Sequence, residues 1–459
     1  MTVRSSAGRP ADRLDRTTKI LIAVLGAAAL AAVLDGTAVT ASLVTLGESF
    51  QADLATIVWV TSAYLMAAGA ALPLVGWASD RFGGRAVFLA GLGLFVGGSL
   101  LTATAGNIGS LVAFRVIQGF GGGLLEPAAL AVAAALAPPD QVGRVMGRCS
   151  LIINVAPVVG PLLGTVLADN GLWRLIFAIN LPLGALIVFA ALRWVPAVVS
   201  ERTPTPPDVR GMLLLAPGFV AVLLMVNRWG AGTATVTVVI AGLIGAALLA
   251  GYLVHAPRSR VTPVLELRLL RIPAFAAALT GMAGVGFLMY SQLTMLPLLA
   301  ESRFGQTGLG RGLLTAALGV GLVISMSNAG GWSDRVGPRP LVTTGAVVTS
   351  AGLATVAVVQ ASWPLGAVMA VFVVIGLGFG SVAAPTFASI YRTLAPEVAA
   401  QGTTAMFIVV QLFASVGVTV MGLLIDDGMT QTGTVFIVLA AVAAALAVNG
   451  LRLPGRAAG

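Results

Sequence analysis

Charged residues are scarce in this sequence: they make up 9% of its 459 residues. A soluble domain carries about 25% charged residues. Hydrophobic residues account for 58% of the chain, so that a folded form could not cover its surface with polar groups. We therefore expect a protein whose solvent is a lipid bilayer.

Three chemically useful residue types occur only once each: Cys149, His255 and Lys19. A single cysteine excludes an internal disulfide and a cysteine-based metal site. A single histidine argues against histidine catalysis and against a cluster of histidines that senses pH. Lys19 follows no glycine-rich phosphate loop, which excludes ATP hydrolysis by this chain. A membrane enzyme or scaffold therefore has no catalytic constellation to support it, and we predict no enzyme, no metal and no cofactor.

Basic residues exceed acidic ones, 26 to 17, and the net charge is +9. Most of these bases lie in short gaps between apolar runs rather than on one face, which indicates membrane topology and not nucleic-acid binding. Counted over alternate gaps, most bases fall on the side that holds the N-terminus. The positive-inside rule then predicts a multi-pass protein of the cell membrane with both termini in the cytoplasm.

Apolar runs long enough to cross a bilayer recur along the whole chain. A bilayer core needs about 20 apolar residues per helix. Runs of this kind lie near 20–44, 57–78, 86–106, 108–135, 145–167, 172–196, 210–229, 233–254, 273–299, 309–331, 340–360, 364–388, 403–425 and 432–452. The sequence therefore predicts an all-α polytopic membrane protein with fourteen transmembrane helices.

A weak internal repeat divides the chain. Residues 76–85 read GWASDRFGGR and residues 330–339 read GGWSDRVGPR, which aligns Asp80 with Asp334. Such repeats are common in secondary transporters, whose substrate site lies between them near the bilayer midplane. We predict two six-helix bundles joined by an inserted helix pair. The expected units are a cytoplasmic tail at 1–19, bundles at 20–197 and 272–453, a linker with the two extra helices at 198–271, and a cytoplasmic tail at 454–459.

Four further motifs occupy individual spans. They are LDGTAVTA at 34–41, RVIQGFGGG at 115–123, NVAPVVGPLLGT at 154–165 and WRLIFAINLPLG at 173–184. Together with the repeated loop, they resemble motifs of the major facilitator superfamily, and more narrowly of its fourteen-span drug:proton antiporter family. The resemblance covers nearly the whole chain. The departures are Thr40 for an Asn, Val44 for a Pro, Ala156 and Thr165 for glycines, and Leu175 for a Trp.

This resemblance implies the major facilitator fold and a proton-coupled secondary antiporter that exports lipophilic or cationic drugs or antibiotic-like compounds. Its partners would be a small-molecule substrate, protons and the lipid bilayer, and we expect a monomer. A metabolite symporter or uniporter of the same superfamily is the alternative. The fifth-span motif, with Gly160, Pro161 and Gly164, is typical of exporters and argues against that alternative. The sixth-span motif is interpreted as structural, with Trp173 and Arg174 anchoring the outer interface.

Three charged residues inside apolar runs are the candidates for proton coupling: Asp35, Arg115 and Glu126. A charge within the membrane is costly and needs a partner or a cavity. Asp35 and Arg115 lie at similar depth, so we expect them to interact directly or through water; alternatively, Arg115 binds only backbone carbonyls of the first helix. Glu126 follows Arg115 by about three helical turns and faces the same side. Which carboxylate carries the proton is left open.

The expected substrate cavity combines these acids with uncharged polar groups, although for each polar group alone helix packing is the better explanation. The candidate lining residues are Asp35, Glu126, Asn154, Tyr290, Gln292 and Gln411. A mostly apolar cavity with two acids suits hydrophobic or cationic compounds better than sugars. By resemblance, the repeated loop latches the two halves in one access state. The latch residues are Gly76, Asp80, Arg81, Arg85, Asp334 and Arg335.

Overall fold

The computed structural model describes most of the chain. The described residues are 15–52, 54–57, 59–137, 142–153, 155–196, 206, 208–230, 235–259, 261, 263–306, 308–394, 396–426 and 432–455. Every regular element in these ranges is a helix, in agreement with the predicted all-α class. Thirteen of the helices are long and apolar enough to cross a membrane.

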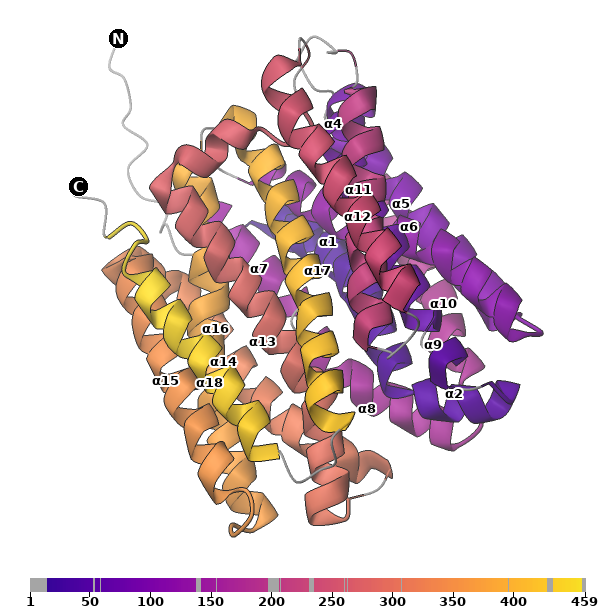
Figure 1. The fold of residues 1–459 in the computed structure, drawn as a ribbon. Coiled ribbons are helices and arrows are strands. Elements are labelled where there is room, and N and C mark those ends of the chain that lie inside the picture. Colours follow the sequence, from indigo (N-terminus) through magenta and orange to yellow (C-terminus); the bar gives the residue numbers. More distant parts are fainter. Residues whose placement is uncertain are drawn as a thin grey trace.

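The helices form two bundles (Figure 1). The first bundle comprises α1 (Arg16–Ala41), α2 (Leu43–Phe50), α3 (Leu54–Ile57), α4 (Trp59–Phe82), α5 (Gly84–Ala103), α6 (Ile108–Leu136), α7 (Val142–Ile153), α8 (Ala156–Asp169), α9 (Arg174–Ala178) and α10 (Asn180–Trp194). The second comprises α13 (Pro273–Phe304), the 3₁₀ turn η3 (Gly308–Gly312), α14 (Leu313–Val336), α15 (Pro338–Val359), α16 (Leu365–Thr393), α17 (Pro396–Asp426) and α18 (Thr432–Gly450). Each bundle has its own large buried apolar core.

The predicted fifth span, 145–167, is divided between α7 and α8. Pro157 lies in the first turn of α8 and Pro161 lies inside it. A proline has no amide hydrogen and its ring clashes with the carbonyl four residues earlier, so Pro157 interrupts the helix after Ile153. Neither piece alone is counted among the thirteen spans, and the total of fourteen therefore stays a prediction.

A second interruption separates α9 from α10 at Ile179, within the predicted span 172–196. Pro182 cannot donate a hydrogen bond to the carbonyl of Ala178, which explains a break at this place. The two pieces still form one apolar run from Arg174 to Trp194. The break matters for the site described below, because Asn180 is the first residue after it.

The internal repeat is visible in the backbone. Gly83, between α4 and α5, has φ 86°, and Gly337, between α14 and α15, has φ 85°. Both lie in the left-handed region that glycine adopts without strain. Arg85 then donates to the carbonyl of Leu192, and Arg339 donates to that of Leu451, each at the end of the last helix of its bundle. The two halves thus share one turn and one closing contact.

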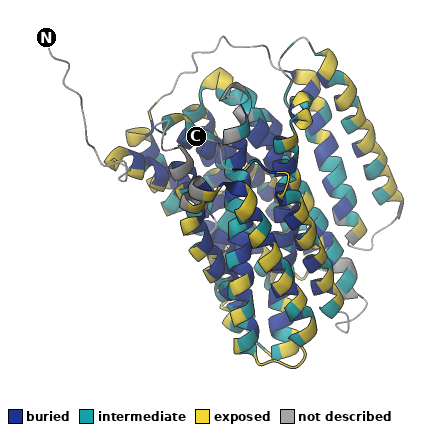
Figure 2. Cartoon of the chain, turned by 90° about the vertical axis from the view of Figure 1, so that its left-hand side faces the viewer, coloured by how far each residue is buried: buried dark blue, intermediate teal, exposed yellow. Residues whose placement is uncertain are grey.

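The inserted pair consists of α11 (Val209–Gly230) and α12 (Thr235–His255), followed by the 3₁₀ turns η1 (Ala256–Arg258) and η2 (Leu267–Arg271). Helix α11 packs against α4 of the first bundle and α17 of the second. The Phe219 ring fills the space beside Gly69 of α4, and Thr419 of α17 donates to the carbonyl of Val226. Helix α12 packs mainly on α11. Exposed residues follow the outward faces of the helices (Figure 2), as expected for surfaces in contact with lipid.

Candidate functional site

A buried ion pair between α1 and α6 forms the centre of the candidate site. Asp35 is 1% exposed and Arg115 is fully buried. The guanidinium Nη1 of Arg115 donates to Oδ2 of Asp35. The predicted contact between these two residues is therefore direct in the structure.

Three polar side chains complete the surroundings of Asp35. Gln118 Nε2 donates to Asp35 Oδ1 at 2.8 Å, and Asn180 Nδ2 donates to the same oxygen at 3.0 Å. The two amides also share Ser99 Oγ of α5, at 2.8 and 3.2 Å. Side chains of four helices, α1, α5, α6 and α10, thus form one hydrogen-bonded cluster, in which the two oxygens of Asp35 accept three hydrogen bonds.

Arg115 has further partners besides Asp35. Its Nε donates to the backbone carbonyl of Val60 at 3.0 Å, and its Nη1 donates to Gln118 Oε1 at 2.7 Å. The guanidinium carbon lies 4.2 Å from the centre of the Tyr64 ring, which is a favourable cation–π distance. The carbonyl that Arg115 binds belongs to α4, not to the first helix as the alternative interpretation expected.

Sequence reasoning did not select Gln118, Ser99 or Asn180 as site residues. Gln118 belongs to the fourth-span motif and Asn180 to the sixth-span motif, which was interpreted as structural. Trp173 and Arg174 do have a packing role, because Trp173 is buried and the Arg174 guanidinium stacks on it at 4.3 Å. Asn180 gives the same motif a second role in binding Asp35.

Glycines of α6 allow α4 to approach the ion pair closely. A Cβ added at Gly119 would lie 2.3 Å from the Tyr64 carbonyl oxygen, and one at Gly123 would lie 2.2 Å from the Ala68 carbonyl oxygen. Contacts this short are incompatible with any side chain, so only glycine permits this packing. The close approach brings the Tyr64 ring over Arg115.

The fifth-span motif packs directly against the helix that carries Asp35. A Cβ at Gly160 would lie 2.0 Å from Thr37 Oγ1, and one at Gly164 would lie 2.1 Å from the carbonyl oxygen of Ala38. Thr37 Oγ1 also donates to the Ala156 carbonyl at 3.3 Å. Helix α8 is therefore fitted to α1 within one turn of Asp35, with Pro161 between the two contact glycines.

Glu126 lies further along α6 and is half-buried. It makes no hydrogen bond or ion pair within the part of the chain that the structure describes. Among the described residues, this carboxylate is therefore not compensated by a positive charge.

The second bundle contributes uncharged polar groups that lack partners among the described residues. These buried atoms are Ser291 Oγ, Gln292 Oε1 and Gln411 Nε2. Such groups are costly unless a hydrogen-bonding partner reaches them. Asn154, the remaining predicted cavity residue, lies outside the described residues. Within the described ranges no cluster of three or more His, Cys, Asp or Glu side chains could hold a metal ion.

The predicted latch residues of the first loop lie where α4 ends and α5 begins. Asp80 and Arg81 are exposed in the last turn of α4, and Arg85 donates to Leu192 at 2.9 Å. A Cβ at Gly76 would meet nothing within 4 Å, so close packing does not require a glycine there. The side chains of Asp334 and Arg335 lie outside the described part.

Replacing Asp80 with asparagine is expected to slow transport severalfold, because the loop that carries Asp80 is predicted to latch the two halves in one access state. Substrate binding should stay nearly unchanged, because Asp80 is exposed at a helix end and is not part of the buried ion pair. The measurement is transport rate and equilibrium substrate binding on the same purified protein. Asp169→Asn, an exposed carboxylate at the end of α8, is the matched control. Equal losses of binding and transport in Asp80→Asn would show that the loop has another role.

Comparison with known sequences identifies relatives along most of the chain. The sequence model of the Major Facilitator Superfamily matches residues 23–418 and again residues 279–457. The chain is 34% identical over 434 residues to the multidrug resistance protein B homolog of Mycobacterium tuberculosis, covering 91% of this chain and 79% of that protein. It is 28% identical over 407 residues to the tetracenomycin C resistance and export protein of Streptomyces glaucescens, covering 88% and 74%.

Solved structures with a similar fold come from transporters of distant sequence. A D-xylose-proton symporter superposes with a TM-score of 0.67 at 16% identity, covering 95% of this chain and 98% of that chain. A POT family transporter in complex with a thioalcohol-conjugated peptide also gives 0.67, at 17% identity and coverage of 94% and 95%. Identities this low establish the fold alone, and the predicted fold class is confirmed.

Proposed function

This chain belongs to the Major Facilitator Superfamily and is a membrane transporter, not an enzyme, and from that premise we propose that it is a proton-coupled antiporter that exports lipophilic or cationic drug-like compounds. The observation that carries the proposal is the ion pair of Asp35 and Arg115, buried between two membrane helices. Relatives named for multidrug resistance and antibiotic export support the export direction. The proposed setting is the cell membrane, with both termini in the cytoplasm and a single chain as the working unit.

Proton exchange at Asp35 is the proposed coupling step. A proton on this carboxyl would remove the negative charge that pairs with Arg115 and would reduce the capacity of its two oxygens to accept from Arg115, Gln118 and Asn180. An isolated buried guanidinium would be strongly destabilising. Arg115 would still have the Val60 carbonyl, Gln118 Oε1 and the Tyr64 ring as partners. The site therefore supports the loss and return of one charge without leaving the arginine unpartnered.

Substrate recognition is proposed at Glu126. An uncompensated carboxylate in a membrane helix offers a cationic compound one opposite charge. The free polar atoms of Ser291, Gln292 and Gln411 add hydrogen-bonding capacity from the other half. A substrate held in this way would contact both bundles, which is what alternating access around a central site requires.

Glu126→Gln tests this assignment, because it removes the charge and keeps the size. Transport of permanently cationic substrates is expected to fall severalfold more than transport of neutral lipophilic ones. The measurement is efflux driven by a pH gradient in proteoliposomes, with matched cationic and neutral substrates. The control is Glu301→Gln, because the Glu301 carboxylate is already paired with Arg311 of η3. An equal effect on both substrate classes would assign Glu126 to proton transfer instead.

The antiport mechanism itself is tested by the double variant Asp35→Asn, Glu126→Gln in the same assay. It is expected to lose all proton-driven, uphill efflux while the protein still inserts and folds. Export that is unaffected by collapsing the pH gradient in the wild-type protein would also contradict proton coupling. Full proton-driven activity in the double variant would remove the carboxylate mechanism altogether.

A further inference from the structure

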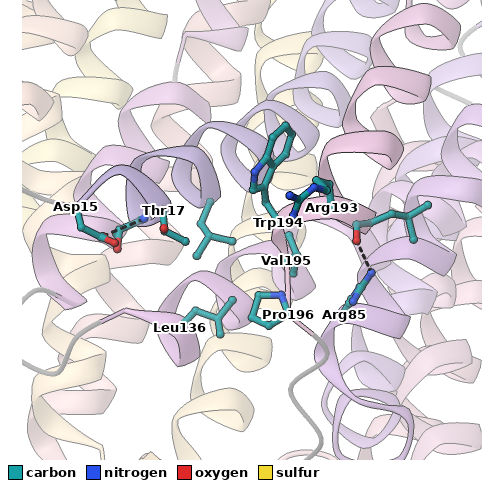
Figure 3. A pocket seen from close by; sticks show the side chains of 11 residues that line it. Asp15, Thr17, Arg85, Leu136, Arg193, Trp194, Val195 and Pro196 are labelled. Carbon is teal, nitrogen blue, oxygen red and sulfur yellow. Dashed lines mark hydrogen bonds between the residues drawn. The ribbon is translucent and has the colours of Figure 1, made fainter.

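A pocket of about 610 Å³ opens at the end of the first bundle that carries the N-terminus. It lies between the beginning of α1, the beginning of α5 and the ends of α6 and α10 (Figure 3). Asp35, Arg115 and Glu126 are not among its lining residues, and Arg85 is the one predicted latch residue that lines it. Its position at helix ends corresponds to the headgroup level of a bilayer rather than to its core.

Two arginines and one aspartate supply the charge of the pocket. Arg85 and Arg193 lie on one side and Asp15 on the other (Figure 3). Arg85 uses one of its N–H groups on the Leu192 carbonyl, which leaves the other donors of its guanidinium, and Arg193 is exposed. Asp15 accepts from the Thr18 amide at 3.0 Å, and hydrogen bonding by Thr18 holds the pKa of this carboxyl below its usual value. With two arginines and one aspartate, the residues that line the pocket carry a net charge of +1.

An apolar surface continues from the pocket along α10. Trp194 lines the pocket, and its ring makes an edge-to-face contact with Phe189 at 6.4 Å between centroids. Phe189 is 65% exposed, and Leu186, one turn further toward the bilayer core, is 64% exposed. Tryptophan is enriched at the membrane–water interface, where its ring lies at headgroup level. A bound molecule could therefore place a polar group in the pocket and hydrocarbon along α10.

The geometry points to a binding site for an anionic phospholipid, with its phosphodiester held by Arg85 and Arg193 and its acyl chains lying along the exposed face of α10. The net charge of +1 matches the single negative charge of a phosphodiester whose remaining headgroup is uncharged, as in phosphatidylglycerol. Basic pockets between membrane helices bind lipid headgroups in this way. The inference is independent of the substrate and of proton coupling.

The test uses the full chain purified in detergent, with lipid binding measured by native mass spectrometry. Arg193→Gln is expected to weaken the first phosphatidylglycerol adduct about fivefold, since one arginine near a membrane surface contributes about 1 kcal/mol. Arg452→Gln is the matched control, because Arg452 follows Leu451 in the second bundle as Arg193 follows Leu192 in the first. Binding of phosphatidylcholine should be weaker and unaffected by either change.

Trp194→Leu is a second variant that keeps the charges and removes the indole, and it should also weaken phosphatidylglycerol binding. Unfolding temperature and elution profile of each variant show whether it is folded. Equal losses of phosphatidylglycerol binding in Arg193→Gln and Arg452→Gln would mean that any surface arginine has this effect. That result would overturn the proposed site. Equally tight, Arg193-dependent binding of soluble glycerophosphoglycerol would overturn the lipid assignment in favour of a free anion site.

Discussion

Asp35→Asn is expected to abolish uphill, proton-driven efflux of every substrate, while downhill movement of substrate persists. Asparagine keeps the size of the side chain, but its amide cannot take up and release a proton as a carboxyl group does. It also cannot accept from all three donors, because one of its two terminal atoms is itself an N–H donor. With Arg115, Gln118 and Asn180 all donating to Asp35, at least one of these hydrogen bonds must be lost.

The measurement is substrate accumulation against its gradient in proteoliposomes with an imposed pH difference. Glu48→Gln, which changes an exposed carboxylate of α2 close to the same helix, is the control and should transport normally. Retained uphill efflux in Asp35→Asn would assign the proton to Glu126 or to another group. Substrate binding in the variant should be preserved, which distinguishes loss of coupling from loss of fold.

Arg115→Ala provides an independent check on the same pair. Removing one member of a buried ion pair costs about 3–5 kcal/mol, because the other charge is left uncompensated. The double variant Arg115→Ala, Asp35→Asn leaves no buried charge at this place, so its loss of stability should be smaller than the sum of the two single losses. If the two losses of stability were strictly additive, the contact between Asp35 and Arg115 would contribute nothing to the stability of the fold.

Gly164→Ala is expected to destabilise the protein by about 1–3 kcal/mol, the usual result of forcing extra volume into a packed contact. Its new Cβ would lie 2.1 Å from the carbonyl oxygen of Ala38, and a backbone atom cannot rotate away as a side chain can. Helix α8 would have to move off α1, three residues from Asp35. We therefore expect loss of transport together with a lower unfolding temperature in detergent.

Gly147→Ala is the matched control for that substitution. Gly147 lies inside α7, on the preceding helix, and an added Cβ there meets nothing within 4 Å. Alanine in a helix interior is favoured over glycine by about 0.5–1 kcal/mol, so this variant should be as stable as the wild type or slightly more so. If the two variants behaved alike, the glycines of the fifth-span motif would have no packing role.

The centre of the site could be predicted from the sequence because charge inside an apolar run has few explanations. Asp35 and Arg115 stand out for that reason, and their helices lie side by side in a known arrangement of bundles. Gln118 and Asn180 could not be selected, because a polar amide in a membrane helix is equally explained by helix packing. The orientation of Asn180 depends on the interruption at Ile179, which Pro182 allows but does not specify.

The ends of the helices could likewise be predicted only in part from the sequence. Prolines at 157 and 161 predict that the fifth span departs from a regular helix. Whether the helix bends or ends there depends on which helices pack beside it, and the sequence does not specify those contacts. The position of the inserted pair between the bundles in the sequence follows from the internal repeat, because two extra apolar runs lie between its copies. The surfaces to which it binds do not, because Gly69 and Phe219 carry no pattern that pairs them.

The contacts of α11 bear on how this chain can be shortened. Deleting 198–271 and joining the two bundles would leave an empty notch beside Gly69, where the Phe219 ring now lies. Thr419 of α17 would lose the Val226 carbonyl as its acceptor. Met66 of α4 and Leu412 of α17, which pack in one apolar cluster with Phe219, would face lipid. The extra pair is therefore not a removable appendage, since each of the two bundles has a surface fitted to it.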